Sequence, residues 1–208
     1  MATRIPEFAL LEKHGIKLIP YGIAKSGKEA AKIAKRLGYP VALKVISDEI
    51  SHKTDYGAVK VGLKNEERML AAYDDIMENV RGHKTSGMLV QKMARKGLEV
   101  LIGGKKDPQF GHMVVLGLGG VYVEVFRDVS ARICPIRKSD VLEMVMELRS
   151  NPLIMGVRGI RPINISALES LMVRVCMIMV EEDIEEMDLN PVIFDEKGYD
   201  IVDVRLRR

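Results

Sequence analysis

The sequence predicts an α+β protein built from two lobes. Helical and extended patterns alternate as far as Gly87, whereas several extended runs follow one another from Met88 to Phe126 before helical patterns return. Consecutive strands joined by loops rich in Gly, Lys and Asp favour a mostly antiparallel sheet. A chain of 208 residues with 47% hydrophobic residues can fill a core in this arrangement. We expect an N-terminal lobe over residues 1–87 and a C-terminal lobe over residues 88–208.

The N-terminal lobe is predicted to contain three helices, each with a recognisable end. They cover residues 7–14 before Gly15, residues 27–37 after the N-cap Ser26 and before Gly38, and residues 66 to about 77–80 after the N-cap Asn65. Extended runs are expected at residues 16–20, 41–46 and 58–63. The run 41–46 is apolar except for Lys44, and a buried lysine needs a partner.

The C-terminal lobe is predicted to begin and end with strands. The expected strands cover residues 88–93, 98–103, 113–116, 121–126, 185–193 and 199–204. Two helices are expected between them, at residues 139–148 and 166–181, and the second has an apolar stripe of Leu168, Leu171, Met172, Val175 and Met179.

Charge and hydropathy exclude two classes of partner. The 32 basic and 29 acidic residues are interleaved and leave a net charge of only +3, so no broad basic face for nucleic acid is expected. No apolar run approaches the roughly 20 residues that a membrane-spanning helix needs, and the first residues lack the apolar stretch of a signal peptide. We expect a cytoplasmic protein.

The two cysteines, Cys134 and Cys176, lie far apart in the sequence. No CxxC pair and no His/Cys cluster at zinc-ligand spacing is present, so neither a disulfide framework nor a structural zinc site is indicated. Both cysteines are expected to be core thiols.

The segment from Ser47 to Val59 has the highest density of reactive groups. It follows Lys44 and contains His52, with Lys53 and Asp55 close by. An imidazole nitrogen can attack phosphorus, and neighbouring cations stabilise the added charge. The segment therefore predicts a histidine that carries phosphate. A surface histidine that only orders its loop is the alternative interpretation.

A glycine-rich turn, Gly117-Leu118-Gly119-Gly120, leads into a predicted strand. Closely spaced glycines let backbone N–H groups approach phosphate oxygens, which makes Gly119 and Gly120 candidate phosphate contacts. The spacing matches neither a dinucleotide fingerprint, which opens a helix, nor a Walker motif. A plain hairpin is the alternative interpretation.

Acidic and amide side chains gather near the C-terminal end of the chain. Asp188 and Asn190 are two residues apart on one strand and share a face, and Asp203 on the next strand can lie beside them. Such oxygen donors could hold Mg²⁺. A hairpin with solvated acids is the alternative. Arg132 and Arg158 could bind phosphate in a bidentate manner or remain solvated on the surface.

Taken in order, these features resemble the ATP-grasp fold, in which two α/β lobes enclose a nucleotide site. The nearer resemblance is to the ATP-grasp (β) subunit of ADP-forming acetyl-CoA or acyl-CoA synthetases, relatives of succinyl-CoA synthetase. It covers nearly the whole chain and rests on residues 38–44, 52–59, 111–124, 156–159 and 188–191.

The resemblance implies binding of ATP or ADP with Mg²⁺. Lys44 matches the lysine that holds ATP phosphate oxygens, and Glu99 matches a nucleotide-contacting glutamate near the ribose. Further matches are the adenine hinge (Gln91, Lys92 and Met93), phosphate contacts (Gly119, Gly120 and Arg158), the Mg²⁺ ligands (Asn190 and Asp203) and an arginine near the transferred phosphate (Arg132).

The resemblance also implies a phosphoryl relay. In this family a histidine of the companion α subunit takes the phosphoryl group, and a second histidine, matched by His52, passes it to ADP. Asp188 matches the acid that faces this second histidine. Two mild departures from the family are Gly57-Ala58, where paired glycines are usual, and Arg127, where lysine is common.

Nothing in the chain resembles the CoA-binding domain, so we expect a separate α subunit in an α₂β₂ enzyme. The implied reaction is acyl-CoA + ADP + phosphate ⇌ acid + ATP + CoA. Two alternatives are a regulatory nucleotide-binding module, of the kind fused to protein acetyltransferases, and a stand-alone carboxylate–amine ligase. Acyl specificity is not encoded in recognisable residues, because the acyl-CoA pocket of the related enzymes lies on the other chain.

Overall fold

The chain forms two compact units in the computed structural model, which describes residues 5–50, 53–120, 128–157, 159 and 161–208. Among these, the first unit holds residues 19–93 and the second holds residues 5–18 and 94–208. Helices and antiparallel sheets make up both units, as the α+β class requires. No helix in the described part of the chain is both long and apolar enough to span a bilayer.

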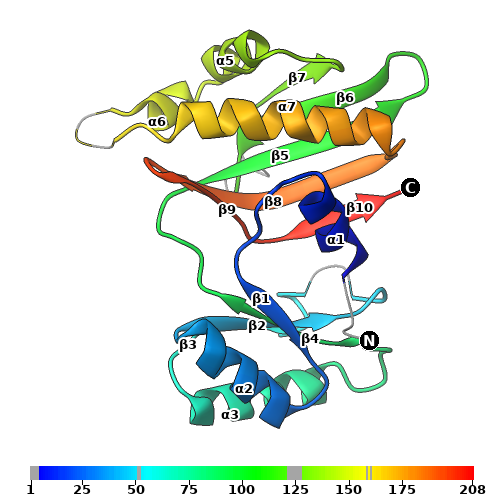
Figure 1. The fold of residues 1–208 in the computed structure, drawn as a ribbon, viewed down its shortest axis with the longest axis vertical. Coiled ribbons are helices and arrows are strands. Elements are labelled where there is room, and N and C mark those ends of the chain that lie inside the picture. The colour runs from blue at the N-terminus through cyan, green and yellow to red at the C-terminus, as the bar shows by residue number, and fades with distance from the viewer. Residues whose placement is uncertain (1–4, 51–52, 121–127, 158, 160) are drawn as a thin grey trace. The chain divides into compact units, whose positions relative to one another are not determined.

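The elements follow one another along the chain as Figure 1 shows. Their bounds are α1 Pro6–Lys13, β1 Tyr21–Ala24, α2 Gly27–Leu37, β2 Val41–Ile46, β3 Val59–Leu63, α3 Glu66–Asn79, β4 Gly87–Lys92, β5 Leu98–Asp107, β6 Gly111–Leu118, β7 Val129–Ile133, α5 Lys138–Glu147, α6 Asn151–Met155, α7 Ile165–Glu181, β8 Glu186–Asp195, β9 Gly198–Ile201 and β10 Val204–Arg207.

The first unit is a four-stranded antiparallel sheet in the order β1-β4-β2-β3. Helices α2 and α3 cover one of its faces (Figure 1). Because side chains alternate along a strand, Val41, Leu43 and Val45 of β2 all point into the core beneath these helices. Lys44 therefore points to the opposite face.

The second unit is a six-stranded antiparallel sheet. Five strands follow the order β10-β8-β5-β6-β7, and β9 also pairs with β8. Helices α5 and α7 pack on one face of this sheet (Figure 1). The predicted stripe of α7 is confirmed, since Leu168, Leu171, Met172, Val175 and Met179 are all buried.

The division between the two units corrects the predicted boundary after Gly87. Strand β4 was expected to open the C-terminal lobe, but it lies between β1 and β2 in the first sheet and pairs with both. Hydrogen bonding to strands distant in sequence decides this membership. Helix α1 was also expected in the first lobe but belongs to the second unit. It packs against β10, and His14, which follows it, contacts Glu182.

Two predicted N-caps are confirmed by side-chain hydrogen bonds. The Ser26 hydroxyl accepts a hydrogen bond from the backbone N–H of Glu29 at 3.2 Å, and Asn65 Oδ1 accepts one from Arg68 at 2.9 Å. These bonds satisfy N–H groups that have no partner inside the helix, so the helices begin where the sequence indicates.

Other expected elements differ from the structure. Residues 16–20 contain no strand, and β1 begins just after them. Strand β7 and helix α6 were not predicted. The expected strand 199–204 is divided into β9 and β10, which both pair with β8. The expected strand 121–126 lies outside the described residues.

Strand β5 approaches helix α7 so closely at Gly104 that a methyl group there would lie 2.5 Å from Met179 Sδ. We expect Gly104→Ala to lower the free energy of unfolding by about 1–3 kcal/mol, because overpacking forces neighbours to move. Urea denaturation measures this change. Gly103→Ala is the matched control, since its methyl group would meet no atom closer than 3.5 Å. Equal destabilisation by both variants would contradict the packing argument.

Candidate functional site

The pleat of the second sheet separates its side chains into two sets. Strand pairing aligns Gly104 with Met187 and Val114, and the approach of Gly104 to Met179 shows that this row faces α7. The adjacent row aligns Gly103 with Asp188 and Val115 and so points to the opposite face. We call this second face, which carries Asp188, the open face of the sheet.

Strand β8 places the predicted acidic and amide residues on the open face. Asn190 is two residues from Asp188 and shares its face. Register pairs Leu189 with Val204, and the Val202 N–H donates to the Pro191 carbonyl oxygen at 3.0 Å, so Asp203 lies beside Asn190. The structure thus brings together three residues that the sequence placed in one group.

The electrostatics of Asp188 distinguish it from an ordinary surface acid. Burial raises the pKa of its carboxyl, and the negative charges of Asp203 and Glu186 raise it further, whereas Arg205 opposes them. Arg205 on β10 stands opposite Asp188 on β8 in the strand register. Sequence reasoning did not select Arg205, although its position two residues after Asp203 places it on the same face.

The donor set on the open face fits Mg²⁺ in chemistry. Asp203 supplies a carboxylate and Asn190 an amide oxygen, and hard oxygen donors of this kind suit a small divalent cation that retains water and phosphate ligands. No group of three or more His, Cys, Asp or Glu residues with metal-binding geometry occurs among the described residues. Asn190 and Asp203 are the residues on this face that could hold such a cation.

Glu99 and the glycine-rich turn lie against each other. The N–H of Gly119 donates to the Glu99 carbonyl oxygen at 2.8 Å, so this N–H is used within the fold and not by a phosphate. Gly120 has a φ of +67°, and a methyl group there would lie 2.3 Å from Glu99 Oε2. These glycines are thus required for the close approach of the turn to β5. The Glu99 side chain itself is exposed.

In the first unit, Lys44 and Gln91 lie on the sheet face opposite α2 and α3. The strand register pairs Lys44 with Leu89 and Ala42 with Gln91. Because Ala42 is two residues from Lys44 on β2, Gln91 lies on the same face of the sheet as Lys44. Both side chains are buried, with 6% and 2% exposure. A cation and an amide are thus held in a region from which water is largely excluded.

Gln91 has a buried hydrogen-bond donor that no described protein group satisfies. Its Nε2 is buried and donates no hydrogen bond to any described residue. An unsatisfied buried amide is costly, and native structures contain few of them. A ligand with a hydrogen-bond acceptor, such as a nucleotide base, fits this donor. Lys92 and Met93 follow Gln91 in the predicted hinge. Lys92 has an exposed side chain, and Met93 Sδ accepts a hydrogen bond from the Gly62 N–H at 3.4 Å.

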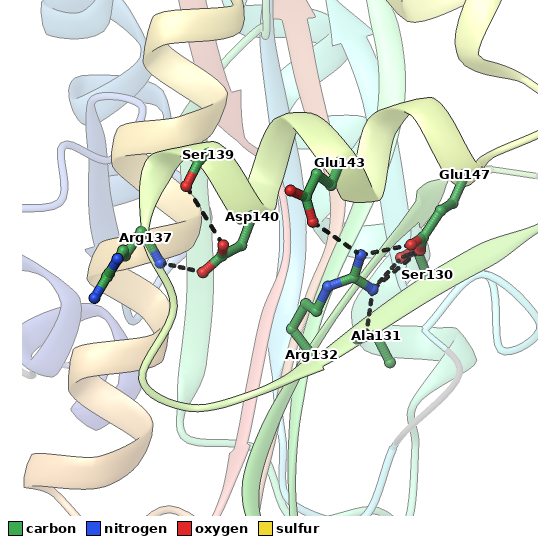
Figure 2. Close-up of polar contacts among 8 residues, drawn as sticks. All are labelled: Ser130, Ala131, Arg132, Arg137, Ser139, Asp140, Glu143 and Glu147. Carbon is green, nitrogen blue, oxygen red and sulfur yellow. Dashed lines mark hydrogen bonds and ion pairs between the residues drawn. The ribbon is translucent and has the colours of Figure 1, made fainter.

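The position of Arg132 argues against the predicted phosphate contact. Arg132 pairs with Val114 and so lies on the face that α5 and α7 cover. Its guanidinium donates to both carboxylate oxygens of Glu147, at 3.0 and 2.5 Å (Figure 2). Ser130 also donates to Glu147, at 2.6 Å (Figure 2). Arg132 is therefore a structural link between β7 and α5, and the structure does not group it with Asp188.

Two predicted site residues, His52 and Arg158, lie outside the described residues. The flanks of the His52 segment are nevertheless attached to the loop after α3. The Lys84 N–H donates to Glu49 Oε2 at 3.0 Å, and the rings of Tyr56 and His83 meet edge to face with centroids 5.4 Å apart. The two ends of the segment are thus fixed to the same loop.

Comparison with known proteins gives the class to which this fold and these residues belong. Residues 3–207 match the model of the ATP-grasp domain family. The chain belongs to this family, and the expected ATP-grasp fold is confirmed.

Particular relatives narrow the class further. The chain is 40% identical to the β subunit of acetate–CoA ligase (ADP-forming) I of Pyrococcus furiosus, over 95% of this chain and 87% of that one. It is 45% identical to acetate–CoA ligase (ADP-forming) I of Archaeoglobus fulgidus, of which it spans only 29%. A solved acetyl-CoA synthetase of Ca. Korarchaeum cryptofilum superposes with a TM-score of 0.93 and 42% identity, over 97% of this chain and 90% of that one. This chain is thus similar to β subunits over nearly their whole length and to one segment of a longer ligase.

The link between Arg132 and Glu147 should make stability depend on acidic pH. Arg132 and Ser130 lower the pKa of Glu147 from 4.5 to about 2. A lowered carboxyl pKa contributes stability above the unfolded-state pKa, and this contribution is lost as pH falls through the folded-state value. We expect Arg132→Met to be less stable than the wild type at pH 7, with the difference shrinking between pH 5 and pH 2. Urea denaturation at each pH measures it.

Glu147→Gln in the Arg132→Met background is the matched control. If the two residues act as one pair, the second substitution should add little to the first. A stability difference that does not depend on pH, or two fully additive losses, would exclude this interpretation. Nucleotide affinity should stay unchanged in Arg132→Met, because Arg132 lies on the helix-covered face.

The raised pKa of Asp188 predicts that the native residue reduces stability. A carboxyl that binds its proton more tightly in the folded state destabilises the fold as pH rises past the unfolded-state pKa, by about 1.4 kcal/mol for each pKa unit. Asp188→Asn should therefore be at least as stable as the wild type at pH 7, and its advantage should disappear near pH 3. Thermal unfolding at the two pH values tests this expectation. Glu186→Gln, an exposed change on the same strand, should shift stability by no more than about 0.5 kcal/mol.

Proposed function

We propose that this chain is the nucleotide-binding β subunit of an ADP-forming acyl-CoA synthetase. The proposed reaction is acyl-CoA + ADP + phosphate ⇌ acid + ATP + CoA. The observation that carries the proposal is the open-face group of Asp188, Asn190 and Asp203 in a chain similar to acetate–CoA ligase β subunits over nearly their whole length. A carboxyl group whose pKa is raised by burial and by neighbouring charges, as that of Asp188 is, is often found at functional sites.

Nucleotide binding is assigned first to Lys44 and Gln91. Lys44 supplies a cation for phosphate oxygens, and its burial strengthens the attraction because water screens it less. The buried Gln91 Nε2 would donate to an acceptor on the base, with Lys92 and Met93 continuing the hinge. Glu99 has an exposed carboxylate that suits ribose hydroxyls.

Mg²⁺ is assigned to Asn190 and Asp203. Bound there, it would neutralise the phosphate charge that develops during transfer. A solved synthetase of Ca. Korarchaeum cryptofilum, 40% identical to this chain, contains coenzyme A and Mg-AMPPCP. That relative supports a magnesium–nucleotide complex as the ligand of this chain as well.

The phosphoryl relay is assigned to His52. Its imidazole would take the phosphoryl group from a histidine of a CoA-binding α subunit and pass it to the β-phosphate oxygen of ADP. Asp188 is assigned the role of the acid that stabilises the charged imidazole in this family. In the same Ca. Korarchaeum cryptofilum synthetase, a phosphohistidine segment points towards the nucleotide binding site. Arg205, beside Asp188, supplies a cation where phosphate charge would arrive.

A separate α subunit completes the proposed enzyme, and an α₂β₂ assembly is the proposed form. The name of the Pyrococcus furiosus relative, a β subunit, supports a partner chain. The relative of Archaeoglobus fulgidus is a longer chain, of which this one covers 29%.

The relay is tested by reconstitution with a CoA-binding α subunit. ATP formation from acetyl-CoA, ADP and phosphate should fall by at least about 100-fold in His52→Ala, because general acid–base and nucleophilic groups contribute on this scale. Binding of Mg-ADP by the isolated chain, measured by calorimetry, should remain. His112→Gln is the matched control and should retain ATP formation.

Full ATP formation by His52→Ala would contradict the proposed role of His52 in the relay. It would not contradict the proposed nucleotide site. A wild-type chain that binds Mg-ADP but forms no ATP with any α subunit would instead contradict the enzymatic proposal. Loss of Mg-ADP binding in Lys44→Ala, with the fold retained by circular dichroism, is expected of the nucleotide site.

A further inference from the structure

The His52 segment, residues 47–59, is attached to the first unit by contacts that lie before and after His52 in the sequence. Before it, the side chain of Ile50 is buried in the core of this unit. After it, the Ala58 N–H donates to the Lys53 carbonyl oxygen at 2.8 Å, and Ala58 itself is buried in the same core. Both flanks of the segment are therefore fixed by packing.

Hydrogen bonds also tie the flank before His52 to the loop after α3. The Ser47 hydroxyl donates to the Lys84 carbonyl oxygen at 2.7 Å and accepts from the Glu49 N–H at 3.2 Å. In return, Glu49 Oε2 accepts from the Lys84 N–H at 3.0 Å. Both backbone polar groups of Lys84 thus bind this flank.

The flank after His52 is attached to the end of α3. Asn79 Nδ2 donates to the Gly57 carbonyl oxygen at 3.3 Å, and the Gly57 N–H donates to the Thr54 carbonyl oxygen at 3.0 Å. Gly57 has a φ of +60°, and a methyl group there would lie 2.7 Å from Asn79 Nδ2. The close approach of this flank to α3 therefore requires glycine.

His83 contacts both flanks. Its Nδ1 lies 3.6 Å from Glu49 Oε2, and its ring meets the ring of Tyr56 edge to face with centroids 5.4 Å apart. Glu49 precedes His52 in the sequence and Tyr56 follows it. One imidazole therefore links the two ends of the segment.

We propose that Glu49 and His83 are positioning residues for phosphoryl transfer. They hold the two flanks of the His52 segment together, so that its histidine is kept in place to receive a phosphoryl group and pass it on. This inference rests on the proposed function, because it concerns the same relay. A displacement of about 1 Å at a reacting group can cost roughly 100-fold in rate, so residues that only fix the segment affect transfer.

The exposure of the two side chains separates this role from a role in the core. The side chain of Glu49 is 43% exposed and that of His83 is 35% exposed. Exposed polar pairs contribute little to the stability of a fold, because water screens them. Removal of either side chain should therefore disturb the segment and leave the first unit folded.

The experiment measures ATP formation by the full chain reconstituted with a CoA-binding α subunit. Glu49→Ala should lower kcat by about 10- to 100-fold and change the KM for Mg-ADP by no more than about twofold, because it leaves the nucleotide residues in place. Glu49→Gln keeps an oxygen that can accept from the Lys84 N–H, so it should restore kcat to within about threefold of the wild type. Glu78→Ala is the matched control, since this carboxylate pairs with Arg81 at 2.9 Å, and it should retain ATP formation.

A second variant tests whether the two residues act together. His83→Ala should also lower kcat with little change in the KM for Mg-ADP. The double variant, Glu49→Ala with His83→Ala, should lose little more than the larger single loss, because both side chains act through one contact. Losses in kcat that multiply fully would exclude a shared role. Circular dichroism checks that each variant is folded.

Hydrogen exchange of the chain without an α subunit tests the contacts independently of activity. In Glu49→Ala, amides of residues 47–57 should exchange about fivefold faster or more, whereas those of β2 and α3 should exchange as in the wild type, because only local opening is affected. Glu78→Ala should leave the exchange of residues 47–57 unchanged.

Three results would overturn the positioning role while the proposed function stands. They are unchanged exchange of residues 47–57 in Glu49→Ala, faster exchange with an unchanged kcat, and a Glu49→Gln variant as impaired as Glu49→Ala. A wild-type chain that forms no ATP with any α subunit would instead refute the proposed function, and the positioning role would fall with it.

Discussion

The alternation of side chains across the second sheet is the constraint on which the chemistry of this protein depends. Each strand must bury one row of side chains beneath α5 and α7, and this burial decides which residues remain on the open face. Asp188 and Asn190 occupy the open face because Met187 and Leu189, their neighbours on β8, are buried under the helices. A shift of one residue in register would exchange the two sets, so core packing and site geometry are determined together.

Buried polar groups distinguish the candidate site residues of each unit from ordinary surface residues. Lys44 and Gln91 in the first unit are almost fully buried. In the second unit, burial raises the pKa of Asp188, because it makes the charged form of the carboxyl less favourable. Such groups reduce the stability of the chain alone, because desolvation of a charge or an amide is unfavourable.

Two arginines on opposite faces of the second sheet have different surroundings. Arg132 has the fork of donors that suits phosphate, but its partner in the fold is the carboxylate of Glu147 (Figure 2). Arg205, which the sequence analysis did not select, lies with Asp188 on the open face. Position relative to the pleat, more than residue type, separates the structural residues from those of the site.

The sequence by itself determined local structure and placed Asp188, Asn190 and Asp203 in one group. Ser26 and Asn65 marked helix starts because capping is a local interaction. The apolar stripe of α7 and the two-residue spacing of Asp188 and Asn190 followed from helix and strand periodicity.

Only the tertiary structure decided which distant segments meet. Strand β4 joined the first unit and α1 the second because each pairs or packs with elements far along the chain, and no local pattern encodes such partners. Strand β7 was missed because it is a short edge strand with mixed polarity. The glycines of the turn gained their role from the neighbouring Glu99. These contacts depend on folding of the whole sheet, so periodicity and spacing could not predict them.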